Sequence, residues 1–91
     1  MNKKTIDIRE LKRQAHALKP VVWVGSKGLS ESVLAEIELA LDSHELIKVK
    51  VVCDKEERPA LLDEIVSNTN AILVGTIGQI CILYRELKEL S

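Results

Sequence analysis

Aromatic side chains are scarce in this sequence of 91 residues, which contains one Trp, one Tyr and no Phe. Proteins that bind single-stranded nucleic acid by stacking several bases need several aromatic rings. The composition therefore argues against multi-base stacking. We expect Trp23 and Tyr84 to pack in the core or to cover it, as large apolar side chains in strands usually do.

Cysteine is also rare. The two cysteines, Cys53 and Cys81, stand 28 residues apart, and the sequence has neither a CxxC pair nor a zinc-finger spacing. Both lie in apolar, strand-like runs, so we expect two buried, reduced thiols. We expect no metal and no other cofactor.

Long apolar runs are missing too. No unbroken apolar run exceeds five residues, whereas a membrane-spanning helix needs about 20. Lys3 and Lys4 are similar to the start of a signal peptide, but no apolar stretch follows them. We therefore expect a cytoplasmic protein with no membrane partner and no small-molecule substrate.

The formal net charge is only −1, whereas a strongly basic balance is typical of proteins that bind nucleic acid. The charge is unevenly distributed, however. Residues 1–28 contain seven basic and two acidic side chains, a balance of +5, and residues 29–91 contain six basic and twelve acidic side chains, a balance of −6. Such an asymmetry between two parts of a chain favours an electrostatic partner.

The basic part is predicted to begin with an amphipathic helix over residues 5–18. Thr5 is a suitable N-cap, Asp7 suits the first turn, and Pro20 ends the helix because the residue before a proline avoids the helical region. Apolar residues recur at helical spacing on one stripe and basic residues on the opposite stripe. The apolar stripe is Ile8, Leu11, Ala15 and Leu18, and the basic stripe is Arg9, Lys12, Arg13 and His16. The solvated face of any surface helix would show a similar basic stripe.

Predicted strands and helices alternate in the remainder of the chain. Residues 21–24 are predicted to form a β-branched strand, Ser30 to cap a second helix, and Pro59 to begin a third helix that ends at Asn68 or Asn70.

The other predicted strands are residues 46–53, 71–75 and 79–85, the last two joined as an antiparallel hairpin by a turn at 76–78. We expect residues 86–91 to form at most a frayed helical turn. The pattern predicts one α/β domain over residues 1–91, with helices packed on a mixed four-stranded sheet.

Lysines alternate with apolar residues in the predicted strand 46–53. Lys48 and Lys50 share one face by the two-residue period of a strand, and apolar residues share the other. The lysine face must reach solvent or a partner. A half-covered sheet explains these two lysines as well as contact with a nucleic acid does.

The segment Gly25-Ser26-Lys27-Gly28 lies between a predicted strand and a predicted helix. Glycines let the backbone approach a ligand, the start of the helix offers free N–H groups, and Lys27 adds a cation. These properties suit a phosphate, as in the GxxG loop with which KH modules clamp the backbone of about four nucleotides. The KH loop joins two helices, so only the loop chemistry is comparable. A tight strand-to-helix turn would contain the same glycines.

The loop and the basic helix are more informative together. Lys19 comes just before the strand that leads into the loop, and Lys27 lies within it. We expect the basic helix to lie beside the loop and to form with it a groove for a phosphate backbone.

Three separated segments resemble the CRM domain (chloroplast RNA splicing and ribosome maturation). They are residues 15–29 (AHALKPVVWVGSKGL), residues 45–51 (ELIKVKV) and the ending from Val74-Gly75 to Ile82-Leu83-Tyr84-Arg85. The segments agree with the family signature in order and spacing, and the resemblance covers nearly the whole chain. A single CRM domain of this size is similar to the bacterial YhbY-type members.

The resemblance implies a fold similar to the C-terminal domain of translation initiation factor three, and RNA binding without catalysis. Bacterial members associate with precursors of the large ribosomal subunit, which implies ribosomal RNA as the partner and a role in ribosome assembly. The family's GxxG loop corresponds to Gly25, Ser26, Lys27 and Gly28, and its basic surface to Arg9, Lys12, Arg13 and Lys19. His16 lies on the same stripe and joins the candidate RNA-binding residues.

Two other functions stay open from the residues alone. A protein adaptor would bind an acidic partner through its basic face and offer the acidic second helix as another surface. An enzyme has little support, because a nucleophilic pair drawn from Ser26, His44 and Cys53 requires assumptions about folding. The carboxylates of the second helix, Glu31, Glu38 and Asp42, are typical of a solvated face.

Overall fold

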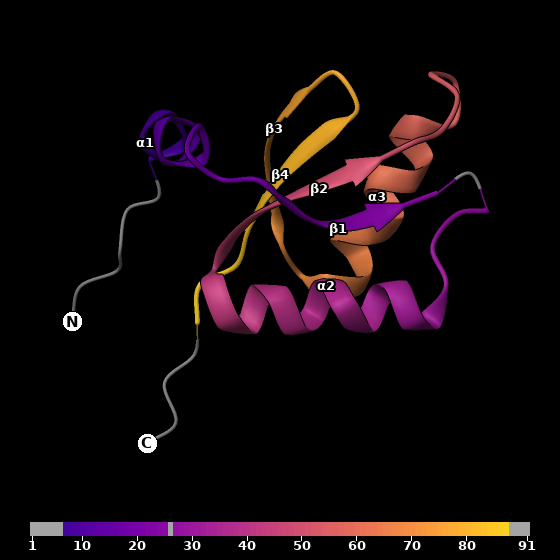
Figure 1. Ribbon diagram of the computed structural model, residues 1–91, viewed down its shortest axis with the longest axis horizontal. Helices are drawn as coiled ribbons and strands as arrows, with labels where there is room; N and C mark the ends of the chain where they lie inside the picture. The colour runs from indigo at the N-terminus through magenta and orange to yellow at the C-terminus, as the bar shows by residue number, and fades with distance from the viewer. Residues whose placement is uncertain (1–6, 26, 88–91) are drawn as a thin grey trace.

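The computed structural model describes residues 7–25 and 27–87, and within them three helices and four strands follow one another in the expected order (Figure 1). The helices are α1 (Ile8–Ala15), α2 (Glu31–His44) and α3 (Arg58–Thr69). The strands are β1 (Pro20–Val24), β2 (Leu46–Val51), β3 (Ile72–Ile77) and β4 (Ile80–Tyr84). No helix in this part of the chain is long and apolar enough to cross a membrane.

The four strands form one mixed sheet in the order β1-β2-β4-β3. β1 and β2 are parallel, and β4 is antiparallel to both β2 and β3. The predicted fold class and the predicted hairpin are therefore confirmed. β4 lies between β2 and β3, so the connection through α3 places β3 at the far edge of the sheet (Figure 1).

The pairing register divides the residues of each strand between the two faces of the sheet. Val22 pairs with Val49, and Trp23 pairs with Lys50. Paired residues point to the same face and successive residues to opposite faces. Val22 and Val49 are buried, so Trp23 and Lys50 share the opposite face, as the strand period of residues 46–53 predicts.

One face of the sheet is covered by α2 and α3, which contact each other; in Figure 1 α2 runs below the strands and α3 rises beside them at the right. Ile37 and Leu41 of α2 and Ile65 of α3 have no exposed surface. They pack against the inward residues of the strands, which are Val22, Val24, Ile47, Val49, Val51, Cys81 and Leu83. Burying an aliphatic side chain of this size contributes about 1.5–3 kcal/mol, so this layer supplies most of the stability of the domain.

Among the described residues, the opposite face is covered at one end by the short helix α1. Ala15 of α1 is fully buried, and Leu11 packs beside it. Their partners on the sheet are Leu46, Val74, Ile82 and Tyr84. Tyr84 is thus a core residue, as expected. We call the uncovered remainder the open face, and it contains the outward residues of β1 and β2: Val21, Trp23, Lys48 and Lys50.

Helix α1 is shorter than the predicted helix over residues 5–18. Its N-cap is Asp7, whose carboxylate accepts the N–H of Arg9 at 3.1 Å, and Thr5 lies outside the described residues. The helix ends at Ala15, because Leu18 N–H donates to the carbonyl of Ala15 at 3.0 Å in a tight turn. The carbonyl of Leu18 accepts a hydrogen bond from Lys48 Nζ at 3.1 Å. A lysine of the sheet therefore holds the turn that replaces the last predicted helical turn.

The hairpin turn is also displaced from its predicted position at 76–78. β3 continues to Ile77, which pairs with Ile80, so that only Gly78 and Gln79 form the turn. Gly78 has a φ of 58°, in the left-handed region that glycine adopts without strain. β2 ends at Val51 rather than at Cys53, and Glu86 and Leu87 are not helical. The rest of the predicted helical turn, 88–91, lies outside the described residues.

The helix signals at α2 and α3 are confirmed. Ser30 is the N-cap of α2, and its Oγ accepts the N–H of Val33 at 3.2 Å. Pro59 lies in the first turn of α3, where its missing N–H is not needed. Asn70 ends α3 with a φ of 59°, a left-handed conformation that asparagine tolerates.

Candidate nucleic-acid interface

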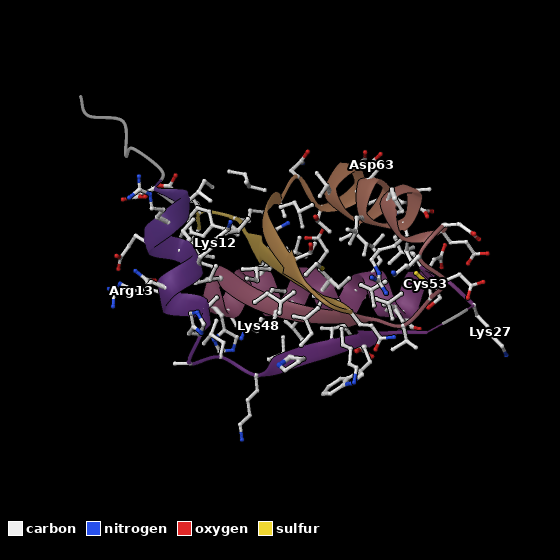
Figure 2. All side chains as sticks on the ribbon, turned by 90° about the horizontal axis from the view of Figure 1, so that it is seen from above. Lys12, Arg13, Lys27, Lys48, Cys53 and Asp63 are labelled. Atoms are coloured by element: carbon white, nitrogen blue, oxygen red, sulfur yellow. The ribbon has the colours of Figure 1, made fainter. Side chains whose placement is uncertain are left out.

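The glycine loop connects β1 to α2 at one end of the molecule. Gly25 and Lys27 are exposed, and Gly28 N–H donates to the carbonyl of Gly25 at 3.0 Å. Gly28 has a φ of +90°, which a residue with a Cβ rarely adopts. Ser26 lies outside the described residues. The loop therefore makes a tight turn in which glycine is required, with the side chain of Lys27 extending from the end of the molecule (Figure 2).

The start of α2 follows the loop directly. The Oγ of Ser30 accepts a hydrogen bond from the N–H of Val33. The other N–H groups of the first turn have no partner within the helix. Such groups attract anions. Glu31 is also in the first turn, and its carboxylate repels a phosphate. The attraction at this end of the molecule therefore depends mainly on Lys27 and on the backbone of the loop.

Helix α1 presents Arg9, Arg13 and His16 to solvent, as predicted. Arg13, however, forms an ion pair with Glu10, and its Nε donates to Glu10 Oε1 at 3.0 Å. Hydrogen bonds from Arg13 and Gln14 lower the pKa of the Glu10 carboxyl to about 2. The charge of Arg13 is therefore partly neutralised by its neighbour before any partner arrives.

Lys12 is exposed like the other basic residues of α1, but its side chain leans toward the sheet. Its side chain turns back over Gly75 of β3, where an added Cβ would come within 2.9 Å of Lys12 Cε (Figure 2). The absence of a side chain at Gly75 allows this approach. Lys12 is exposed, as the basic stripe predicts, but its side chain leans toward β3 because its position borders the apolar side of a short helix that packs on a sheet.

Lys19 lies between α1 and β1, and its side chain is exposed. It lines a surface depression of about 460 Å³ at the end of the molecule opposite the loop. The other lining residues are Gln14, Ala17, Leu18, Val21, His44, Leu46 and Ile47. Lys19 therefore continues the basic surface of α1 toward the start of β1.

The structure separates the basic helix from the glycine loop. The long axis of the molecule measures 43 Å, and the two features lie at its opposite ends, with Arg13 near one end and Lys27 at the other (Figure 2). The expected groove between them is wrong, because β1 leads from one feature to the other and holds them a strand length apart. A nucleic acid that contacts both features must cross the open face.

The cations between the two ends come from β2. Lys48 and Lys50 lie on the open face, one beside the turn that follows α1 and the other beside Trp23. The alternation of lysines with apolar residues in 46–51 predicts their common face. The sequence did not indicate that this face lies between the two candidate sites.

Trp23 is the aromatic residue whose position was predicted wrongly. Its side chain is 58% exposed because α1 covers only the other end of this face. Cys81 is buried as expected, whereas Cys53 is half-buried, and both are free thiols. The sequence carries one signal for this exposure: Trp23 alternates with Val22 and Val24, so it must face the opposite side of the strand from them. All three residues suit a core, so the signal does not show which side is exposed.

Acidic residues gather on the side of the molecule away from the open face. The solvent sides of α2 and α3 carry Glu31, Glu36, Asp42, Asp63 and Glu64. Arg85, at the end of β4, donates to Glu38 and Asp42 of α2, each at 2.8 Å. Half of the acidic side chains of residues 29–91 thus lie on α2 and α3, whereas Lys48 and Lys50 from the same part of the chain lie on the open face.

The residues considered for catalysis are not assembled. His44 ends α2 just before β2, and Cys53 follows the other end of β2, so the length of the strand separates them. Ser26 lies outside the described residues. Within 7–25 and 27–87, no group of three His, Cys, Asp or Glu side chains is placed to hold a metal ion.

Comparison with known proteins connects this arrangement to a family. Residues 4–85 match the CRS1 / YhbY (CRM) domain. An RNA-binding protein of Haemophilus influenzae is 54% identical over 80 residues, which cover 87% of this chain and 81% of the relative. A Pseudomonas aeruginosa protein, named a probable RNA-binding protein, is 46% identical over 79 residues, which cover 86% of this chain and 76% of the relative.

A solved structure agrees with the fold. The solution structure of a Staphylococcus aureus protein, described as a candidate RNA-binding protein, superimposes with a TM-score of 0.80 and 32% identity. The match covers 92% of this chain and 88% of the other. With three helices on a mixed sheet and a match over nearly its whole length, the chain belongs to the CRS1 / YhbY (CRM) domain family.

Proposed function

We propose that this protein binds RNA along the open face of its sheet, between the glycine loop and α1. The observation that carries the proposal is the separation of charge across the sheet. Lys48 and Lys50 lie on the open side between the basic residues of α1 and Lys27 of the loop, and the acidic side chains of α2 and α3 lie on the other side. The names of the relatives as RNA-binding proteins support the same partner.

Phosphates supply most of the attraction in this proposal. Lys27 and the loop backbone hold the RNA at one end, Lys48 and Lys50 contact it in the middle, and Arg9, Arg13, His16 and Lys19 hold it at the other end. Each neutralised phosphate releases condensed counterions, so binding weakens as salt increases. The acidic side of the domain repels RNA and keeps it on the open face.

The RNA we propose is ribosomal RNA in precursors of the large ribosomal subunit, bound in the cytoplasm and without catalysis. The resemblance to bacterial YhbY-type members is the basis for this finer assignment. A domain that binds phosphates from one side suits an assembly factor, because such contacts hold an RNA without cutting or joining it.

A titration across salt concentrations tests the proposal. A labelled fragment of large-subunit RNA is titrated with the wild-type protein and with Lys27→Ala and Arg13→Ala. Each variant is expected to weaken binding and to lower the slope of log K against log salt by about one for each phosphate that the variant no longer neutralises. Lys27→Ala should show the larger effect, because Arg13 already shares its charge with Glu10.

Lys55→Ala is the matched control, since it removes the same charge from a residue that lies beside α3 with Asp63 and Leu73. It should leave the salt slope nearly unchanged. Unchanged binding in both Lys27→Ala and Arg13→Ala would refute the proposal. Copurification after nuclease treatment distinguishes a protein adaptor, which keeps its partner, from an RNA-bound protein, which loses it.

A further inference from the structure

Trp23 occupies an unusual place for the single tryptophan of a small domain. It is 58% exposed on β1, the strand that runs directly into the glycine loop. A large ring on the surface costs hydrophobic stabilisation that burial would provide. Its neighbours Val22 and Val24 are buried on the other side of the strand, so the register of β1 directs this ring outward.

The register places Trp23 at one end of a row that crosses the sheet. Trp23 pairs with Lys50, Lys50 with Ile80, and Ile80 with Ile77. Ile77, at the other end of the row, is 57% exposed. The next row contains Lys48, Ile82 and Gly75, where the side chain of Lys12 lies over the glycine. The first row is therefore the part of this face that neither α1 nor the side chain of Lys12 reaches.

Lys50 stands between the exposed apolar residues of this row. Among the residues that the structure describes, no acidic side chain lies within ion-pair distance of it. An apolar protein surface that covered the row would bury this ammonium group without a counter-charge, at a high cost in free energy. A nucleotide avoids this cost, because it brings a flat apolar base and a phosphate together.

We propose that Trp23 is a stacking platform for one unpaired base of the bound RNA, and that Lys50 contacts the phosphate beside that base. The inference rests on the proposed RNA binding and adds a base-contacting position to a surface that otherwise grips phosphates. It needs one aromatic ring, so it agrees with a composition that excludes stacking of several bases. The site lies beside the glycine loop, where a strand of RNA held by Lys27 passes onto the open face.

The single tryptophan makes the test direct, since all indole fluorescence comes from Trp23. The full-length protein is titrated with a short unstructured RNA and with an abasic oligonucleotide of the same number of phosphates. The RNA should quench the fluorescence of Trp23, and the abasic strand should not. Trp23→Ala should weaken RNA binding by roughly 5- to 150-fold, the range found when one base–aromatic stack is removed. It should leave the weaker binding of the abasic strand unchanged.

Trp23→Phe and Val21→Ala are the control variants. Phenylalanine keeps an aromatic face, so Trp23→Phe should bind RNA with most of the wild-type affinity. Val21→Ala removes exposed apolar surface from the same strand without removing a ring, so it should bind as the wild-type protein does. Circular dichroism confirms that each variant is folded before it is titrated.

The outcomes separate the two proposals. No binding of RNA by the wild-type protein would overturn the proposed function itself. RNA binding of unchanged affinity in Trp23→Ala, or equal quenching by the abasic strand, would overturn the stacking site alone. A blue shift of the fluorescence that follows protein concentration without RNA would instead identify the row as a protein contact and would also overturn the stacking site.

Discussion

The two faces of the sheet are built from alternate residues of the same strands, yet they have different surroundings. On one face, α2 and α3 bury a continuous layer that includes Ile37, Leu41 and Ile65. On the other, α1 covers one end and leaves Trp23 exposed and Lys50 half-buried. The difference shows how a domain of this size can draw most of its stability from one face while part of the other stays exposed.

Charge follows the same division. The acidic side chains lie on the solvent sides of α2 and α3, and the lysines of β2 lie on the open face. A net charge near zero therefore conceals two oppositely charged sides. Field strength at a surface depends on local charge and not on the total, which is why the net charge is a poor guide to partners here.

The largest difference between the faces is expected in stability. Ile65→Ala removes a side chain that is fully buried beneath the sheet, and it should lower the free energy of unfolding by about 2–5 kcal/mol, measured by urea denaturation. Ile77→Ala makes the same substitution on the open face and should change the free energy by about 0.5 kcal/mol or less. Similar decreases in the two variants would contradict the division of the sheet into a stabilising and an open face.

A smaller difference in the free energy of unfolding is expected when Arg85 or Lys48 is replaced, two basic residues that each donate a hydrogen bond to a backbone carbonyl outside their own strand. Arg85 donates to the carbonyl of Thr69 at 2.8 Å and also to Glu38 and Asp42, so it joins β4 to both helices of the covered face. The two carboxylates raise the pKa of Arg85, so its charge is permanent. Arg85→Ala should lower the free energy of unfolding by about 1–3 kcal/mol, because it leaves these groups without their donor.

Lys48→Ala is the matched variant on the open face, where Lys48 donates to the carbonyl of Leu18 alone. This substitution should cost about 1 kcal/mol or less, in the same urea measurement. A larger cost for Lys48→Ala than for Arg85→Ala would show that α1 and its turn hold the fold together more than the covered layer does.

The smallest expected difference between the faces is in the reactivity of the two thiols, and measuring it requires no change in stability. Burial raises the pKa of Cys81 to about 11, so at pH 7 this inward-facing thiol is almost entirely protonated and is shielded from reagents. Cys53 is half-buried and should react first with an alkylating reagent. Mass spectrometry of the native protein should find Cys53 modified and Cys81 unmodified. Equal rates of modification at the two cysteines would contradict the burial of Cys81 between the sheet and its helices.

The sequence predicted the elements where local chemistry decides them. Ser30 was recognisable as an N-cap, and Asn70 as a helix end, because each acts on residues within a few positions. The ends of α1 and of the hairpin were predicted less well. Lys48, far away in the sequence, binds the turn after Ala15, and the pairing of Ile77 with Ile80 extends β3 past its predicted end.

The candidate site was predicted in its parts but not in its arrangement. The basic helix, the glycine loop and the lysines of β2 were each identified by residue type and spacing. Their relative positions depend on how β1 pairs with β2 and where α1 packs, and these are contacts between residues distant in the sequence. For the same reason Trp23 was assigned to the wrong surroundings, and the approach of Lys12 to Gly75 was not predicted.

By itself, the sequence determined which strand residues share a face of the sheet, which positions require glycine, and how the charge is distributed along the chain. Periodicity and backbone sterics are local properties, and they survive without any tertiary contact. Only the tertiary structure decided that β4 lies between β2 and β3, that α1 covers one end of a face, and that the open face joins the basic helix to the loop. These choices follow from the burial of apolar surface, which depends on the whole chain at once.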